Sequence, residues 1–259
     1  MRVRWVAAVF AIVGLAACSD SNDNTADTTA APTTSTLPPS TTAAVDEAEL
    51  VQSALLTVDD MPTGWTEAPN ESDAQDAENA QRISDCSGLD VKLIGDGVLG
   101  DTKAKSPEFS SPDSLASVKQ TLGLAPDEAT ASAAIAAIGD DGLPPCYEEA
   151  IRTSFDEAAV TTNPAESLPD GMTLTDVSME RIDPPPATIT ADDVVWYKAT
   201  ASLDYQGQAL DIYLDLVFTR TGRVLSQIEF DGTTTPFPEE LYAPTVTAAH
   251  EKIATVATA

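Results

Sequence analysis

Apolar and polar residues alternate through residues 194–230 with a period of two, which fits β-strands and no helix. One face collects the apolar side chains of three successive runs: Val195, Tyr197, Ala199, Ala201 and Leu203, then Leu210, Ile212, Leu214, Leu216 and Phe218, then Val224, Ile228 and Phe230. The pattern predicts three antiparallel strands that form a meander, with this face directed toward the core.

The turns between these runs predict how the strands pair. Gln206-Gly207 suits a two-residue type I′ loop, because glycine accepts a positive φ. This loop places Ala199 opposite Leu214 on the inner face and Lys198 opposite Asp215 on the outer face.

The second turn is predicted as a three-residue loop over residues 220–222, because a two-residue loop there would bury Gln227 and Glu229. Phe218 then pairs with Val224. The outer face gains an apolar row that consists of Trp196, Val217 and Leu225, next to Tyr213. We expect the opening helix or an edge loop to cover most of this row; left open, it would mark a partner or ligand site.

Patterns outside the meander predict helices over residues 46–56, 126–138 and 145–159 and a terminal helix after Pro238. The apolar stripe of the terminal helix (Val246, Ala249, Ile253, Val256) should pack on the inner face of the sheet. Strands are predicted over residues 103–110, 115–124 and 172–182, the last with a bulge near Asp176. An acidic loop up to residue 84 and a glycine-punctuated loop over residues 95–100 complete the prediction. Together these elements predict an α+β fold with helices packed on one largely antiparallel sheet.

The first 17 residues have the features of a cleaved lipoprotein signal peptide. Arg2 and Arg4 precede an apolar run that is too short to span a bilayer comfortably, and Leu15-Ala16-Ala17-Cys18 follows it. This tetrapeptide resembles a bacterial lipobox, which implies cleavage before Cys18 and diacylglycerol, with acyl chains such as palmitate, on its sulfur. The alternative is an ordinary signal peptide with a chance cysteine at its end.

Residues 18–44 are predicted to be the lipidated cysteine and a disordered tether. Ser and Thr make up 12 of the 26 residues after Cys18, and Leu37 is the one sizeable aliphatic residue, so the segment cannot bury enough surface to fold. The globular domain then spans residues 45–259. A lipid anchor together with an export signal predicts a location on the extracytoplasmic face of the cell membrane.

The cysteine count supports this organisation. If lipid occupies Cys18, the remaining two cysteines, Cys86 and Cys146, form a pair that should be a disulfide in an oxidising compartment. A zinc site or a cysteine nucleophile would need further ligands or a base, and His250 is the one histidine of the chain.

Charge and residue inventory exclude several functional classes. The formal net charge is −29, so phosphate backbones are repelled and nucleic-acid binding is excluded. His250 lies beside the apolar stripe of the terminal helix, where packing is its expected role. The acidic clusters Asp140-Asp141 and Asp192-Asp193 are expected to be loop residues, with a weak calcium site as the alternative. No cofactor or metal is implied.

The order of these features resembles an actinobacterial lipoprotein. The features are the lipobox, the threonine-rich tether, an opening helix that leads to Asp60-Met61-Pro62-Thr63-Gly64-Trp65, a cysteine before a helix starting Pro145-Cys146, and then four strands and a helix. The globular part is similar to the extracellular sensor domains of mycobacterial Ser/Thr kinases and to PsbP-like lipoproteins. That resemblance implies a disulfide-bonded, non-enzymatic α+β domain.

These observations lead to one main functional hypothesis and two alternatives. We expect a membrane-anchored lipoprotein with a binding or sensor-like domain, whose partner is a protein or a small molecule. A carrier of lipid or another apolar molecule is the first alternative and would need an internal cavity of several hundred Å³. A carboxylate-based enzyme is the second, since 42 acidic residues always provide pairs.

Overall fold

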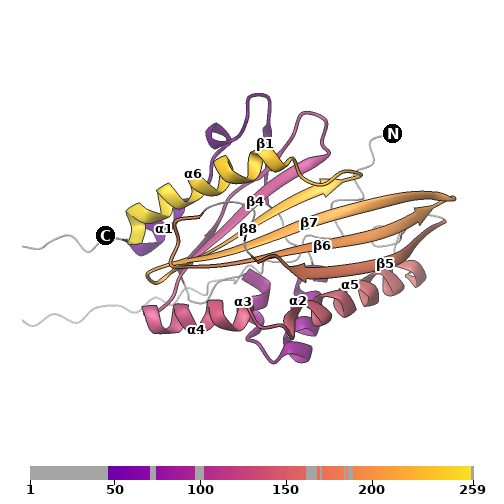
Figure 1. Ribbon diagram of the computed structural model, residues 1–259, viewed down its shortest axis with the longest axis horizontal. Coiled ribbons are helices and arrows are strands. Elements are labelled where there is room, and N and C mark those ends of the chain that lie inside the picture. The colour runs from indigo at the N-terminus through magenta and orange to yellow at the C-terminus, as the bar shows by residue number, and fades with distance from the viewer. Residues whose placement is uncertain are drawn as a thin grey trace, which may run out of the picture.

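An antiparallel sheet runs through the middle of the fold and carries helices on both faces (Figure 1). The computed structural model describes residues 46–70, 74–96, 102–161, 168–169, 171–183, 185 and 189–257. The signal peptide and the tether predicted over residues 1–17 and 18–44 lie outside this part. The α+β class predicted from the sequence is confirmed, with helices packed on one largely antiparallel sheet.

Along the chain, α1 and a short strand precede two helices, three strands, two further helices, the four strands β5 to β8 and the terminal helix. The helices in the described part are α1 (Glu47–Ser53), α2 (Ala74–Ser87), α3 (Val91–Asp96), α4 (Glu128–Ile138), α5 (Leu143–Val160) and α6 (Glu239–Ala257), with a 3-10 turn η2 at Val58–Asp60. The strands there are β1 (Thr66–Ala68), β2 (Thr102–Lys105), β3 (Glu108–Ser110), β4 (Ala116–Leu124), β5 (Met172–Arg181), β6 (Asp193–Tyr205), β7 (Gln208–Thr221) and β8 (Val224–Thr233). The strand order is β1-β3-β4-β8-β7-β6-β5, and β2 pairs with β4.

The meander forms as predicted at its first turn. Ala199 lies opposite Leu214 and Lys198 opposite Asp215. Gln206 and Gly207 both have positive φ values, 55° and 82°, as a type I′ loop requires. The bulge predicted in β5 is also present, because the register shifts between Leu174 and Asp176.

The register predicted for the second turn is wrong. The loop consists of Gly222 and Arg223, so Thr221 pairs with Val224 and Phe218 with Gln227. Gly222 has φ 58° at the first loop position, where a two-residue loop of this kind favours glycine. The shift places Leu225, Gln227 and Glu229 on the face of Phe218, which is the arrangement that the prediction had rejected.

The two faces of the sheet have separate cores. On the face that we call the α5 face, strand residues such as Tyr197 and Leu214 pack with Ile135 of α4 and Ile151 of α5. On the opposite face, which we call the α6 face, strand residues pack with α6 and α1. Figure 1 shows α6 and α1 on one side of the sheet and α2 to α5 on the other.

The terminal helix therefore lies on the opposite face from the one predicted. Its stripe is buried as expected, but it packs, through Tyr242, Val246 and Ala249, against Trp196, Val217, Ile228 and Phe230. The physical reason is that β8 presents two large apolar residues to the α6 face once its register is shifted. Both faces of the meander therefore need a helical cover.

Part of the segment expected to be an acidic loop is helical, because residues 74–87 form α2. Helix α3 at residues 91–96 reaches the start of the glycine-punctuated loop predicted over residues 95–100, and residues 97–100 lie outside the described part. In α2 the large apolar residue is Ile83, which is fully buried. The predicted strand over residues 103–110 is divided into β2 and β3 around Ser106-Pro107, because proline cannot donate a hydrogen bond to the ladder.

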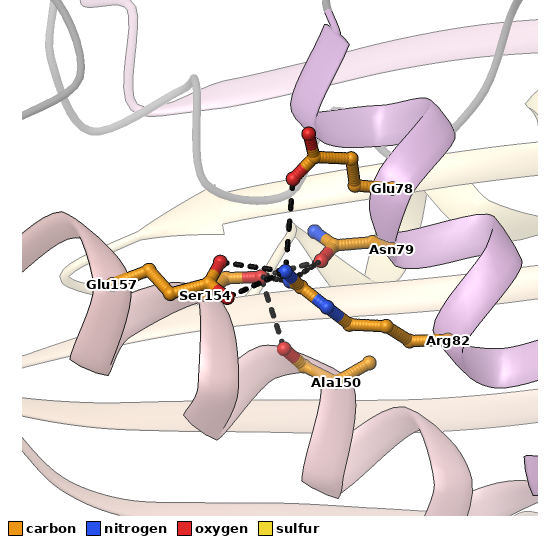
Figure 2. A network of polar contacts seen from close by, with 6 residues as sticks. All are labelled: Glu78, Asn79, Arg82, Ala150, Ser154 and Glu157. Atoms are coloured by element: carbon orange, nitrogen blue, oxygen red, sulfur yellow. Dashed lines mark hydrogen bonds and ion pairs between the residues drawn. The ribbon is translucent and has the colours of Figure 1, made fainter.

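Helix α2 is held on α5 at two places. The disulfide between Cys86 and Cys146 joins the helices, with 5.7 Å between the Cα atoms. One turn earlier in α2, Nη2 of Arg82 donates hydrogen bonds to both carboxylate oxygens of Glu157 in α5, at 2.7 and 2.6 Å. Figure 2 shows this fork beside the buried side chains of Asn79 and Ser154, whose Oδ1 and Oγ atoms are 2.5 Å apart. Covalent and polar contacts thus replace the wide apolar face that α2 lacks.

Candidate functional site

The apolar row considered from the sequence does not form an exposed patch. Trp196 and Val217 have no exposed surface, and α6 covers them together with Leu56, Met61 and Trp65. Leu225 is also buried, but on the α5 face, because the register of β8 is shifted. Of the four residues proposed for the patch, Tyr213 alone is partly accessible.

The accessible part of the α6 face lies beside this core, over β5, β6 and β7. In Figure 1, α6 runs over the β4 and β8 side of the sheet and leaves the other side uncovered. Strand side chains on the uncovered part are polar. There they line a pocket with a volume of about 330 Å³, together with Ala199 and the loop after β8: Ser178, Glu180, Lys198, Thr200, Tyr213, Asp215 and Pro236.

The floor of this pocket is the buried carboxylate of Asp215, which is 3 % exposed. Its Oδ1 accepts a hydrogen bond from Nε1 of Trp196 at 2.7 Å, and its Oδ2 accepts one from the hydroxyl of Tyr242 at 2.5 Å. Both oxygens are therefore engaged by aromatic donors of the α6 face. These two bonds connect the pocket to the core beneath α6.

Burial raises the pKa of the Asp215 carboxyl, although the hydrogen bonds from Tyr242 and Trp196 and the nearby Lys198 act in the opposite direction. The Nζ atom of Lys198 lies 4.0 Å from Oδ1 of Asp215 and 5.9 Å from the ring centroid of Tyr242. Burial and the bond to Asp215 also raise the pKa of Tyr242, so its hydroxyl stays protonated and donates at neutral pH. The floor thus combines one ammonium group, one carboxyl group and an aromatic donor.

The loop that carries Pro236 into the pocket has a strained residue. Thr234 has φ 69°, which is unusual for a β-branched side chain. Its backbone N–H donates to the carbonyl of Asp211 at 2.9 Å, which ties the loop to β7. Gly232 allows the loop to fold back, because a Cβ atom there would collide with the carbonyl of Thr235. Such strain persists only where surrounding contacts enforce it, and it is common at binding sites.

The acidic clusters noted from the sequence have structural partners. Asp192 and Asp193 both contact the guanidinium group of Arg220 at the end of β7. Asp140 accepts a hydrogen bond from the backbone of Gly142 just before α5. Across the described ranges, no group of three or more His, Cys, Asp or Glu side chains is placed to hold a metal ion.

A second buried polar group lies on the α5 face, between β4 and β8. Lys119 of β4 and Glu229 of β8 form an ion pair with 3.1 Å between Nζ and Oε2. Nε2 of Gln227 donates to Oε1 of Glu229 at 3.1 Å. Burial and the Glu229 charge raise the pKa of Tyr147, which places the α5 tyrosine beside this pair. The group sits within the core, so we assign it to stability and not to binding.

The sequence analysis singled out some of the residues that line the pocket, but it did not predict the pocket itself. The pairing of Lys198 with Asp215 was predicted, but as a surface pair on the outer face. The signal that could have identified the site is a single acidic residue, Asp215, between Leu214 and Leu216 and near Trp196 on the adjacent strand. Cys18, the predicted lipidation site, lies outside the described residues.

Comparisons with known proteins leave the family open. No family model matches the chain, and its sequence matches no curated protein. Among solved structures, the extracellular domain of PknH from Mycobacterium tuberculosis has a weak resemblance, with a TM-score of 0.31 and 11 % sequence identity. The match covers 66 % of this chain and 76 % of that chain.

Proposed function

We propose that the protein is an exported lipoprotein whose globular domain binds a small polar molecule without transforming it. The observation that carries the binding proposal is the pocket over β5, β6 and β7 with Asp215 as its floor. Pockets with a few convergent polar groups and a carboxyl of perturbed pKa are the usual form of a ligand site.

The contacts of Asp215 favour binding over catalysis. A general acid or base must present an oxygen to the substrate, whereas both oxygens of this carboxylate already accept bonds from Trp196 and Tyr242. The other carboxylate of the pocket, Glu180, is exposed to solvent. The polar lining also disfavours a lipid or other apolar cargo, which requires apolar walls.

The disulfide supports export. A bond between Cys86 and Cys146 persists in oxidising compartments outside the cytoplasm, and it leaves Cys18 as the unpaired cysteine available for lipid. No helix in the ranges covered by the structure is long and apolar enough to cross a membrane. We infer that the diacylglycerol on Cys18 holds the domain at the membrane surface, in a sensor-like or binding role.

The anchor is tested by Cys18→Ala. We expect this variant to lose incorporation of labelled fatty acid and to leave the mature membrane fraction, because lipid is attached to that sulfur in the proposed maturation. Ser19→Ala is the matched control, since it changes the adjacent residue and keeps the cysteine. Continued membrane retention with full lipid labelling in Cys18→Ala would contradict the proposed anchor.

The pocket is tested through the indole N–H of Trp196, which donates directly to Asp215 beneath it. Its resonance in the full chain is assigned by its disappearance in Trp196→Phe. In a library of amino acids, nucleosides, sugars and organic acids, we expect at least one compound to shift this resonance saturably and to be recovered unchanged. The indole of Trp65, buried in the same core, is the internal control and should move less. A library without effect on Trp196 would refute the binding function.

A further inference from the structure

The chemistry of the side chains that line the Asp215 pocket also restricts the class of ligand that fits it. Its side chains include hydroxyl groups, one ammonium group and carboxyl groups within the same cavity of about 330 Å³. The hydroxyls of Ser178 and Thr200 both donate and accept, Lys198 only donates, and the Glu180 carboxylate only accepts. A ligand that matches this mixture needs several groups that each donate and accept.

The charges in the pocket disfavour an ionic ligand of either sign. An anion would meet two carboxyl groups, Glu180 and Asp215, and one ammonium group in a chain of net charge −29. An amine would compete with Lys198, which already lies 4.0 Å from Asp215 and 5.9 Å from the centroid of the Tyr242 ring. A neutral ligand avoids both conflicts.

The pocket also offers two non-polar surfaces at its edge. The ring of Tyr213 is half-buried, and its hydroxyl lies 3.3 Å from Oδ2 of Asp211, a bond that limits rotation of the ring. Pro236 faces the pocket from the strained loop. The electron-rich face of an aromatic ring attracts weakly positive C–H groups, so it complements the non-polar face of a hydroxylated ring.

We propose that this pocket binds a neutral polyhydroxylated molecule, a saccharide unit, with its hydroxyls toward Glu180, Lys198 and Thr200 and a C–H face toward Tyr213. This inference rests on the proposed binding function of the same pocket. The bonds from Trp196 and Tyr242 to Asp215 hold the floor rigid before the ligand arrives. A site organised in this way loses less entropy on binding than a flexible one.

The test compares neutral sugars with charged derivatives of glucose on the full chain. The neutral panel is glucose, galactose, mannose, arabinose and maltose, and the charged panel is glucosamine and glucose 6-phosphate. Titrations follow the indole resonance of Trp196. We expect at least one neutral sugar to bind saturably, at least tenfold more tightly than either charged probe.

Variants locate the binding in the pocket. Tyr213→Ala should weaken the binding of the active sugar at least tenfold, and Thr200→Val should weaken it measurably while it preserves the shape of the side chain. Tyr205→Ala is the matched control, because Tyr205 is an exposed tyrosine at the end of β6 on the opposite face. The Tyr205→Ala variant should bind the active sugar with the affinity of the wild type. Equal loss in Tyr205→Ala and Tyr213→Ala would overturn the assignment.

The outcomes also separate this inference from the proposed function. If a charged probe shifts Trp196 and no neutral sugar does, the ligand class is wrong while the pocket remains a binding site. If neither panel nor the wider library shifts Trp196, the binding function and the ligand class are both wrong.

Discussion

Lys119→Met should lower the free energy of unfolding by about 3–5 kcal/mol, because it removes the ammonium group that is ion-paired with the buried Glu229 carboxylate on the α5 face. Lys119 and Glu229 are 9 % and 5 % exposed, and their charged atoms are 3.1 Å apart. Removal of one partner from a buried pair costs far more than the pair contributes, since the remaining ion keeps its desolvation penalty.

The double variant Lys119→Met/Glu229→Met distinguishes this effect from a loss of packing. With both charges removed, stability should return to within about 1 kcal/mol of the wild type, because apolar side chains of similar volume suit a buried site. Denaturant unfolding of the four proteins of the cycle gives the coupling energy. Arg223→Met, which breaks the exposed ion pair with Glu47, is the control and should cost about 1 kcal/mol or less. A cost for Lys119→Met as small as that of the control would contradict the buried-pair argument.

This ion pair also explains why one strand register was predicted wrongly. The alternation in residues 194–230 was sufficient to predict three strands, and the Gln206-Gly207 turn was sufficient to predict the pairing of β6 with β7. The second turn was chosen to keep Gln227 and Glu229 out of the core. That rule fails here because Lys119, which is more than 100 residues earlier in the chain, supplies the opposite charge on the neighbouring strand.

The face covered by α6 could not be predicted for a related reason. The stripe Val246, Ala249, Ile253 and Val256 shows that α6 has a buried side, but it does not say against which face of the sheet. The choice depends on the register of β8, which places Ile228 and Phe230 beside Trp196 and Val217. The wrong register predicted for one turn therefore led to a wrong prediction of the sheet face on which α6 packs.

The candidate site was also predicted only in part, because its burial depends on residues far away in the sequence. The sequence places Lys198 opposite Asp215, and the structure agrees. The burial of Asp215 arises from Tyr242 of α6 and from the returning loop at Thr234, two features without a local pattern around residue 215. The strand patterns therefore predict some of the residues of the pocket, whereas the pocket itself depends on α6, which begins beside it.

The disulfide is the second feature on which a large part of the stability should depend. Cys86→Ala/Cys146→Ala should lower the free energy of unfolding by about 4 kcal/mol in the chain-entropy model, because the bond closes a loop with a sequence separation of 60 residues. The loss should be greatest in α2, whose single large apolar anchor is Ile83. Amide hydrogen exchange should therefore show reduced protection in α2 before the central strands β6 to β8 change.

Reduction of a chain that keeps both Cys86 and Cys146 provides the matched comparison. In a Cys18→Ala background, Cys86 and Cys146 should not react with thiol reagents until dithiothreitol is added, and the reductant should then lower the unfolding midpoint to that of the double alanine variant. The same reductant should leave the double variant unchanged. The fork between Arg82 and Glu157 remains in both cases and limits the detachment of α2 from α5. Two free thiols in the untreated protein, or a midpoint insensitive to reduction, would show that the pair does not secure α2.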